Sequence, residues 1–178
     1  MKNILVIKTS LRYNSNSDIL ADKFVEGVIL NNNVEVISLK DKKINFCIGC
    51  MSCAKNKKCF MNDDANMITD EIAKADVIVW STPIYYYSMS GQMKTLIDRA
   101  NSLYVRGPKF KEVYLLATAT DTEKYTPDGA KKGVQGWVDC FDGVKFVDTL
   151  FIGGVNDPKD ILNSSELNKA YELGKSIK

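Results

Sequence analysis

Short apolar runs alternate along this chain with segments in which apolar residues recur every three or four positions. The runs are rich in valine and isoleucine and are bounded by polar residues, which is typical of strands buried in a parallel sheet. The segments with helical spacing are amphipathic, as helices that cover a sheet are. We therefore expect strands at residues 4–7, 34–39, 77–80, 112–119 and 144–152.

The helical segments begin at recognisable signals. Asp63 and Asp64 place carboxylates at the positive end of a helix dipole, and the apolar residues behind them repeat at helical spacing. Asp18 is interpreted in the same way, as a helix-start residue rather than a catalytic acid. We expect helices over residues 19–29, 63–75, 91–104, 129–141 and 167–177, with Cys140 in the core near Trp137, and with Asp98 and Arg99 paired or facing solvent.

Five strands alternating with five helices predict a doubly wound α/β sheet of parallel strands in the order 2-1-3-4-5. We expect one domain over residues 1–178, with a cysteine-rich insertion at residues 40–62. In this topology, ligands bind at the carboxyl ends of strands one and three. Segments 9–17 and 81–90 should therefore lie side by side around one crevice, with segment 118–125 beside them.

Composition excludes several classes of function. The 24 lysines and arginines nearly balance the 22 aspartates and glutamates, so we expect neither a nucleic-acid nor a membrane partner. Without a recognisable signal peptide or spanning segment, the expected location is cytoplasmic. The chain has no histidine, which excludes Ser-His-Asp and Cys-His nucleophiles and imidazole metal ligands. Chemistry would then come from a bound cofactor, from carboxylates and lysines, or from cysteine thiolates.

The segment Thr9–Ser17 follows the first strand and has no acidic residue. Its hydroxyls, amides and single arginine stand where a strand turns into a helix, and the free N–H groups of a helix N-terminus attract anions. The simpler interpretation is an ordinary turn with Ser15 or Ser17 as the helix cap. Because the predicted topology puts this turn at the ligand-binding edge, we favour a phosphate site.

The second loop at this edge has three consecutive tyrosines, Tyr85 to Tyr87, beside Pro83 and Ile84. Flat aromatic and apolar groups with exposed backbone suit a planar heteroaromatic ring. The tyrosines could equally pack against a partner subunit. Glycine-rich dinucleotide and P-loop motifs are absent, so a phosphate loop with an aromatic loop favours FMN over NAD or ATP as the tightly bound ligand.

These two loops resemble those of the NAD(P)H-dependent FMN reductases of the flavodoxin-like superfamily, and of the iron–sulfur flavoproteins among them. Thr9-Ser10-Leu11-Arg12-Tyr13-Asn14-Ser15-Asn16-Ser17 is similar to the family pattern Gly-Ser-Pro-Arg-x-x-Gly-Asn-Thr. Thr82-Pro83-Ile84-Tyr85, followed by Ser90-Gly91-Gln92-Met93-Lys94 and Asp98-Arg99, is similar to Ser-Pro-Val-Tyr…Ser-Gly-Gln-Leu-Lys…Asp-Arg.

The resemblance implies a flavodoxin-like three-layer sandwich with FMN as cofactor and NAD(P)H as co-substrate. It assigns the phosphate to Ser10, Arg12, Asn16 and Ser17. The flavin ring would lie against the second loop. By its position rather than by a motif, the segment Thr118–Asp121 after the fourth strand would close the crevice. The expected ring-site residues are Thr82, Pro83, Ile84, Tyr85, Tyr86, Ser88, Thr118 and Asp121.

Four of the five cysteines fall in one short segment with the spacing Cys47-x2-Cys50-x2-Cys53-x5-Cys59. Four thiolates so close in sequence could hold a [4Fe–4S] cluster, and this spacing resembles that of the iron–sulfur flavoproteins. Tetrahedral zinc is geometrically feasible as well. Related flavin reductases carry a similar loop without a metal, so free thiols are a third interpretation.

The leading hypothesis is an FMN-dependent oxidoreductase that passes electrons from NAD(P)H through FMN to a small-molecule acceptor such as a quinone. No residue of the chain need act as acid or base, since the hydride chemistry belongs to the cofactor. The alternative is an electron carrier that takes electrons from a ferredoxin-like protein through a cluster at Cys47–Cys59. A third hypothesis is a flavin-free interaction domain. We also expect a homodimer or homotetramer.

Overall fold

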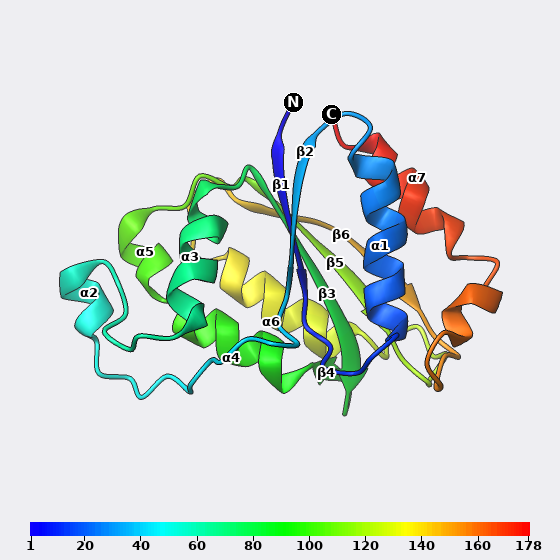
Figure 1. Cartoon of the computed structure of the whole chain (residues 1–178), viewed down its shortest axis with the longest axis horizontal. Helices are drawn as coiled ribbons and strands as arrows, with labels where there is room; N and C mark the ends of the chain where they lie inside the picture. The colour runs from blue at the N-terminus through cyan, green and yellow to red at the C-terminus, as the bar shows by residue number, and fades with distance from the viewer.

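The structure is a computed structural model that describes residues Met1 to Lys178. Its centre is a six-stranded sheet, in which five parallel strands follow the order β2-β1-β3-β5-β6 (Figure 1). The order predicted from the sequence is therefore confirmed, but the count of five strands was one too few. The strands are β1 (Asn3–Lys8), β2 (Asn33–Ser38), β3 (Val77–Tyr85), β4 (Ser88–Met89), β5 (Glu112–Thr118) and β6 (Lys145–Ile152).

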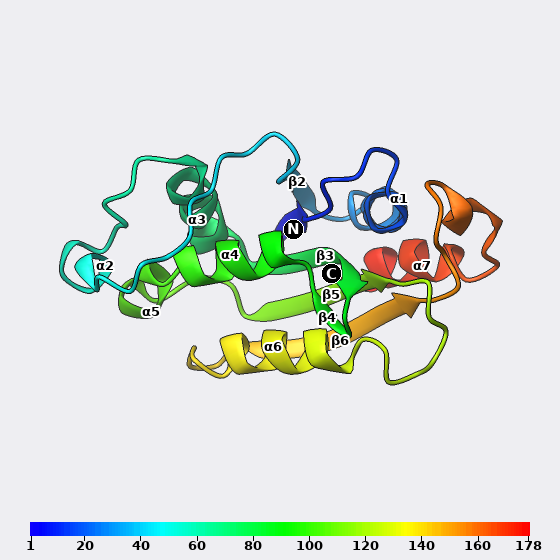
Figure 2. The same ribbon diagram turned by 90° about the horizontal axis from the view of Figure 1, so that it is seen from below.

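Helices cover both faces of the sheet, which gives the three layers of a flavodoxin-like sandwich (Figures 1 and 2). Helices α1 and α7 lie on one face, and α3, α4 and α6 lie on the other, while α2 projects away from the sheet. The helices are α1 (Asn16–Val28), α2 (Ser52–Asn56), α3 (Asp64–Lys74), α4 (Gly91–Arg99), α5 (Ser102–Arg106), α6 (Asp128–Val138) and α7 (Asn168–Ser176), with a 3-10 turn η1 (Asp160–Asn163).

Alternate residues of each strand pack into two separate cores, because successive side chains of a strand point to opposite faces. Ile4 and Val6 of β1 join the core under α1 and α7. Leu5 and Ile7 join the larger core under α3, α4 and α6, where Trp80 packs edge-on against Trp137. The buried stripes predicted for the helices on this face are confirmed. No helix combines the length and the apolar character that crossing a bilayer requires.

The predicted loop 81–90 is wrong in its first half, because β3 continues through Thr82, Pro83 and Ile84 to Tyr85. It then turns back as β4, with Tyr85 paired to Ser88. The two turn residues, Tyr86 and Tyr87, both have positive φ, at 48° and 61°. A two-residue hairpin with a type I′ turn needs this left-handed geometry at both residues, which costs about 1–2 kcal/mol for each non-glycine residue. Two-residue hairpins are recognised in a sequence by glycine, asparagine or aspartate at the turn. Two tyrosines give no such indication, so the hairpin was not predicted.

Two further expectations were wrong. The helix predicted over 91–104 is two helices, α4 and α5, separated at Ala100 and Asn101; Asn101 and Ser102 favour helix ends over interiors. Cys140 is exposed rather than buried, because α6 ends at Val138 and leaves Cys140 in the turn beyond it. Its Sγ donates to the carbonyl of Gly136 at 3.3 Å.

Candidate functional site

The carboxyl ends of β1, β3, β5 and β6 surround a small pocket, as expected for this topology. Its volume is about 130 Å³, well below the ~300 Å³ of a site that encloses a whole drug-sized ligand. It can therefore enclose one end of a cofactor. The lining residues are Ser10, Arg12, Ser15, Asn16, Ser17, Pro83, Ile84, Tyr85, Thr118, Ala119, Thr120, Val155 and Asn156.

The first turn of α1 supplies the hydrogen-bond donors of this pocket. Ser15 is the N-cap, and its Oγ accepts from the N–H of Asp18 at 3.2 Å. The Oγ of Ser10 accepts from the N–H of Arg12, which leaves the Ser10 hydroxyl hydrogen free to donate. Ser17 lies 3.4 Å from Ser15, Oγ to Oγ. Three buried hydroxyls and the unpaired N–H groups of a helix start thus converge on one small volume.

Arg12 and Asn16 reach the same pocket but are tied to the segment after β6. Arg12 donates to the carbonyl of Asn156 at 2.6 Å. The Asn16 amide donates to the carbonyl of Asp157 at 2.9 Å and accepts from the N–H of Ile161 at 3.2 Å. Asn16 therefore positions the 156–161 segment, and its amide nitrogen keeps one N–H that no hydrogen bond of the chain uses.

Ser10, Ser15 and Ser17 form a cradle of hydroxyl groups, and Asp18 is the acidic residue in the first turn of α1 beside it. Burial raises the pKa of its carboxyl and outweighs the attraction of Lys40, whose Nζ lies 3.3 Å from Asp18 Oδ2. The other carboxyl oxygen, Oδ1, is buried without a hydrogen-bond partner. A raised pKa and a neighbouring lysine both reduce the repulsion that Asp18 would exert on an anion in the pocket.

The β3–β4 hairpin forms the aromatic wall of the site. Pro83, Ile84 and Tyr85 line the pocket, whereas Tyr86 at the tip is fully exposed. Tyr87 stacks on Tyr125 with ring centroids 5.9 Å apart. The hairpin therefore combines pocket-facing groups at its base with exposed aromatic rings at its end.

Four of the predicted ring-site residues do not line the pocket. Thr82 is fully buried, and its Oγ1 accepts from the N–H of Ser90, so it stabilises the hairpin instead. Tyr86 and Ser88 lie at and beyond the turn. Asp121 accepts from the N–H of Glu123 and the hydroxyl of Thr126, and these hydrogen bonds lower the pKa of its carboxyl.

Val155 and Asn156 were not predicted as site residues, whereas Thr120 belongs to the segment 118–121 that was expected to close the crevice. The Oγ1 of Thr120 donates to Asn156 Oδ1 at 3.1 Å, so the loops after β5 and β6 meet at the pocket. The available signal was positional, since the last strand of a parallel sheet ends at the same edge as the others. We expected loops after the first, third and fourth strands there, but not the loop after the fifth.

The four clustered cysteines line a second pocket, of about 460 Å³, at the C-terminal end of α4. Cys47 and Cys50 are exposed, and Cys53 and Cys59 are half-buried. A donor set of four sulfurs around one cavity fits a thiolate-bound metal group. As the loop stands, no three of these side chains come close enough together to hold a metal ion.

The expectation that Asp98 and Arg99 pair or face solvent was right for Asp98, which is exposed, and wrong for Arg99. Asp98 pairs with Lys94, whose Nζ lies 2.7 Å from Asp98 Oδ1. Arg99 points inward, has a fully buried side chain and pairs with Asp63, the N-cap of α3. The interpretation of Asp63 as a helix-start residue is confirmed.

Comparison with known proteins agrees with this geometry. Residues 2–127 match the model of the family described as NADPH-dependent FMN reductase. An NAD(P)H-dependent FMN-containing oxidoreductase of Bacillus subtilis, whose assignment is putative, is 31% identical over 130 residues, 68% of each chain. An iron–sulfur flavoprotein of Archaeoglobus fulgidus is 30% identical over 99 residues, 56% of this chain and 45% of the relative. The chain thus spans about half the length of that relative.

The fold has a close counterpart among solved structures. An NAD(P)H:quinone oxidoreductase from Methanothermobacter marburgensis superposes with a TM-score of 0.75 at 18% identity, and the match covers 98% of this chain and 96% of that one. The matched family region runs from β1 through the α1 cradle and the β3–β4 hairpin to the loop before α6. On this match and on the fold, the chain belongs to the NADPH-dependent FMN reductase family.

Proposed function

We propose that this chain binds FMN at the carboxyl edge of its sheet and passes electrons from NAD(P)H to a small-molecule acceptor such as a quinone. The observation that carries the proposal is the cradle at the first turn of α1, where Ser10, Ser15 and Ser17 converge beside Arg12. Hydroxyl donors and a helix N-terminus fit the dianionic phosphate of FMN. The apolar groups at the hairpin base fit its ring system.

The chain's own contribution is binding and orientation. Ser10, Ser15 and Ser17 would hold the phosphate, and Arg12 would add a positive charge at the pocket rim. Pro83, Ile84 and Tyr85 would exclude water from one end of the ring. When bound, FMN supplies the chemistry of hydride acceptance from NAD(P)H and of electron delivery to a second substrate.

The cradle predicts that FMN is held by its phosphate, which riboflavin lacks. Ser17→Asp places a carboxylate in the cradle at a position of the first turn where acids are compatible with the helix. We expect this variant to bind FMN about 10- to 100-fold more weakly, since it replaces a hydrogen bond to a charged group with repulsion. Riboflavin binding should change less than about threefold. Titration calorimetry with both flavins measures the difference.

Asn168→Asp is the matched control, because it adds the same charge to the exposed first turn of α7, away from the pocket. It should leave both affinities unchanged. If wild-type protein bound riboflavin as tightly as FMN, the phosphate cradle would be wrong.

The activity is tested by following NADH and NADPH oxidation by the FMN-loaded protein with a quinone as acceptor. No acceptor-dependent oxidation with either nucleotide would refute the reductase assignment.

A second candidate function is an electron carrier in which the cysteine loop passes electrons from a ferredoxin-like donor to FMN. It is supported by the four sulfurs around one pocket and by relatives named iron–sulfur flavoproteins. The test is the iron and acid-labile sulfide content of protein purified without oxygen. About four of each per chain, together with no oxidation of NAD(P)H, would favour the carrier. Absence of both elements would eliminate it.

A further inference from the structure

The last residue of α4 and the residue just before α5 each donate a hydrogen bond to a cysteine sulfur. Arg99 Nη2 lies 3.4 Å from Cys59 Sγ, and Asn101 Nδ2 lies 3.3 Å from Cys53 Sγ. Both sulfurs line the 460 Å³ pocket, together with Arg99 and Asn101 themselves. Two donors placed two residues apart therefore contact two of the four clustered thiols.

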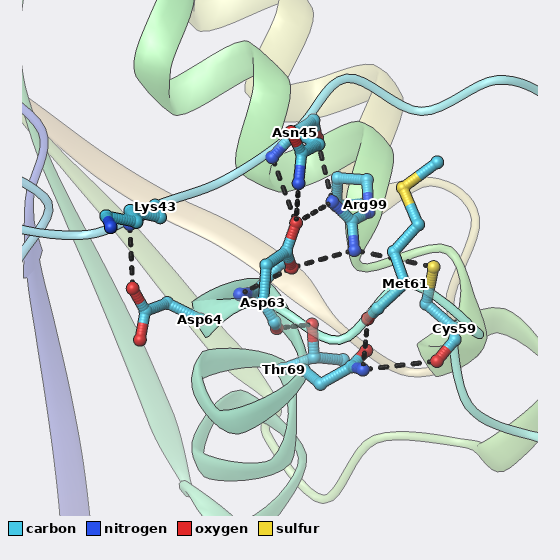
Figure 3. Close-up of polar contacts among 10 residues, drawn as sticks. Lys43, Asn45, Cys59, Met61, Asp63, Asp64, Thr69 and Arg99 are labelled. Carbon is cyan, nitrogen blue, oxygen red and sulfur yellow. Dashed lines mark hydrogen bonds and ion pairs between the residues drawn. The ribbon is translucent and has the colours of Figure 1, made fainter.

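Arg99 is itself fixed in place. Its guanidinium makes a forked pair with Asp63, Nη1 to Oδ2 at 2.6 Å and Nη2 to Oδ1 at 2.9 Å, and Nη1 also donates to the carbonyl of Asn45 at 2.8 Å (Figure 3). A planar guanidinium held at both ends of its fork has one orientation. The hydrogen bond to Cys59 therefore comes from a rigid donor rather than from a mobile surface side chain.

The same residues close the two ends of the cysteine loop. Asn45, before the first cysteine, donates through its backbone and its side chain to Asp63 Oδ2, after the last one, at 3.0 Å in each case (Figure 3). Asn66 holds the carbonyls of Cys59 and Met61 at 3.1 Å and 2.7 Å. Between these anchors, α2 has no buried residue. The loop is thus held at its ends, at Cys53 and at Cys59.

Cys47 and Cys50 are different. Both are exposed, no hydrogen bond reaches either sulfur, and the backbone between and after them turns through left-handed conformations at Gly49 and Met51. Cys53 and Cys59 are therefore tied by hydrogen bonds to Asn101 and Arg99, whereas no hydrogen bond holds the sulfurs of Cys47 and Cys50.

We infer that Arg99 and Asn101 are positioning residues for a half-preorganised thiol site. They hold Cys59 and Cys53 toward the shared pocket. Cys47 and Cys50 then complete the site when a thiolate-bound group enters that pocket. The inference rests on the loop geometry and holds whether or not the flavin site is as proposed. It assigns a function to the buried arginine that neither the flavin cradle nor the hairpin requires.

The test is the alkylation rate of each cysteine by iodoacetamide in reduced, metal-free full-length protein, read by peptide mass spectrometry. Cys53 and Cys59 should react at least several-fold more slowly than Cys47 and Cys50. Asn101→Ala, at an exposed position, should raise the alkylation rate of Cys53 at least threefold and leave the rate of Cys59 unchanged. Arg99→Lys keeps the positive charge but loses the forked guanidinium. It should therefore raise the alkylation rate of Cys59 and not that of Cys53.

Arg106→Lys is the matched control, because Arg106 pairs with Asp70 at 2.7 Å and touches no cysteine. It should change none of the four rates. Equal rates for all four thiols in the wild-type protein would overturn the inference, and so would an Asn101→Ala variant with an unchanged Cys53 rate. A general loss of structure would instead raise the rates of the half-buried pair together. FMN affinity measured on the same variants should stay at the wild-type value.

Discussion

At the scale of single residues, the strongest electrostatic feature is the buried pair Arg99–Asp63. The two side chains are 0% and 5% exposed. Removing one partner of such a pair leaves an uncompensated buried charge, which costs more than the pair contributes when intact. Burial of the Asp63 carboxyl opposes ionisation, but hydrogen bonds from Arg99 and Asn45 outweigh it and lower its pKa.

This pair predicts a pH-dependent stability. Because the pKa of Asp63 is lower in the folded chain, its contribution is complete above the unfolded value near 3.9 and is lost as the pH falls through the folded value. Asp63→Asn should lower the free energy of unfolding by about 3–5 kcal/mol at pH 7. The difference in this free energy between variant and wild type should shrink below about pH 4. Urea unfolding followed by tryptophan fluorescence at several pH values measures both.

The control is Asp70→Asn, which breaks the half-exposed pair with Arg106. Partly exposed pairs contribute about 0–1 kcal/mol, so this variant should stay close to wild type. A deficit in Asp63→Asn that stayed constant down to pH 3 would show that the carboxylate charge is not what stabilises the folded chain.

Some residues of the two pockets could be predicted from the sequence, and others could not. Ser10, Ser15 and Ser17 stand out because their side-chain chemistry and their place after a strand both indicate an anion site. The burial of Arg99 could not be predicted, since its partner Asp63 lies 36 residues away and only the packing of α3 on α4 brings them together. Asn156 was missed for a similar reason, because it reaches the pocket only where the loops after β5 and β6 meet, at its hydrogen bond from Thr120.

At the scale of elements, the helix that carries the cradle is held by its neighbour. Helices α1 and α7 pack with backbones almost in contact at two glycines (Figure 1). A Cβ on Gly174 would stand 2.3 Å from the carbonyl oxygen of Phe24, and one on Gly27 would stand 2.1 Å from that of Tyr171. Backbone atoms on both sides leave no side chain that could move aside.

Gly174→Ala is therefore expected to destabilise the chain by about 1–3 kcal/mol or more through overpacking. Thermal and urea unfolding measure the change. The matched control is Gly136→Ala in α6, another helix glycine, where an added Cβ meets nothing within 4 Å. That variant should gain about 0.5–1 kcal/mol, since alanine favours a helix over glycine. Destabilisation of equal size by both would contradict the packing argument.

The order of the elements was predictable, but several of their ends were not. Periodicity and composition located all five parallel strands and the cores under the helices. The β3–β4 hairpin depends on a turn of Tyr86 and Tyr87 that local preference opposes. Its geometry is imposed by tertiary contacts: a Cβ on Gly129 of α6 would lie 2.2 Å from the Tyr87 carbonyl, so the turn sits directly against the start of that helix.

At the scale of the whole molecule, one group of exposed aromatic side chains lies on and beside the β3–β4 hairpin. Tyr86 is fully exposed, and the stacked Tyr87 and Tyr125 are each more than half exposed. Clusters of exposed apolar side chains in a soluble chain often mark an interface. A homodimer or homotetramer remains our prediction for this chain.

Sedimentation at micromolar concentration tests this assembly. Wild-type protein should sediment as a dimer or tetramer, and Tyr86→Glu at the hairpin tip should shift it toward monomer, because a buried unpaired charge is costly at an interface. Tyr104→Glu, at another exposed tyrosine, on α5, serves as control and should leave the assembly unchanged. A monomeric wild-type protein would contradict the prediction.

Helix α4 links the two sites of this molecule as a rigid spacer. Its N-cap Ser90 contacts Thr9 at the start of the cradle, Oγ to Oγ1 at 2.9 Å, and its final residue Arg99 contacts Cys59. Nine residues at 1.5 Å each set the separation of these contacts at about 13 Å. One inserted residue would also rotate Arg99 by about 100° around the helix axis and turn it away from Asp63. Among descendants of this chain, α4 should therefore tolerate substitution far better than any change in its length.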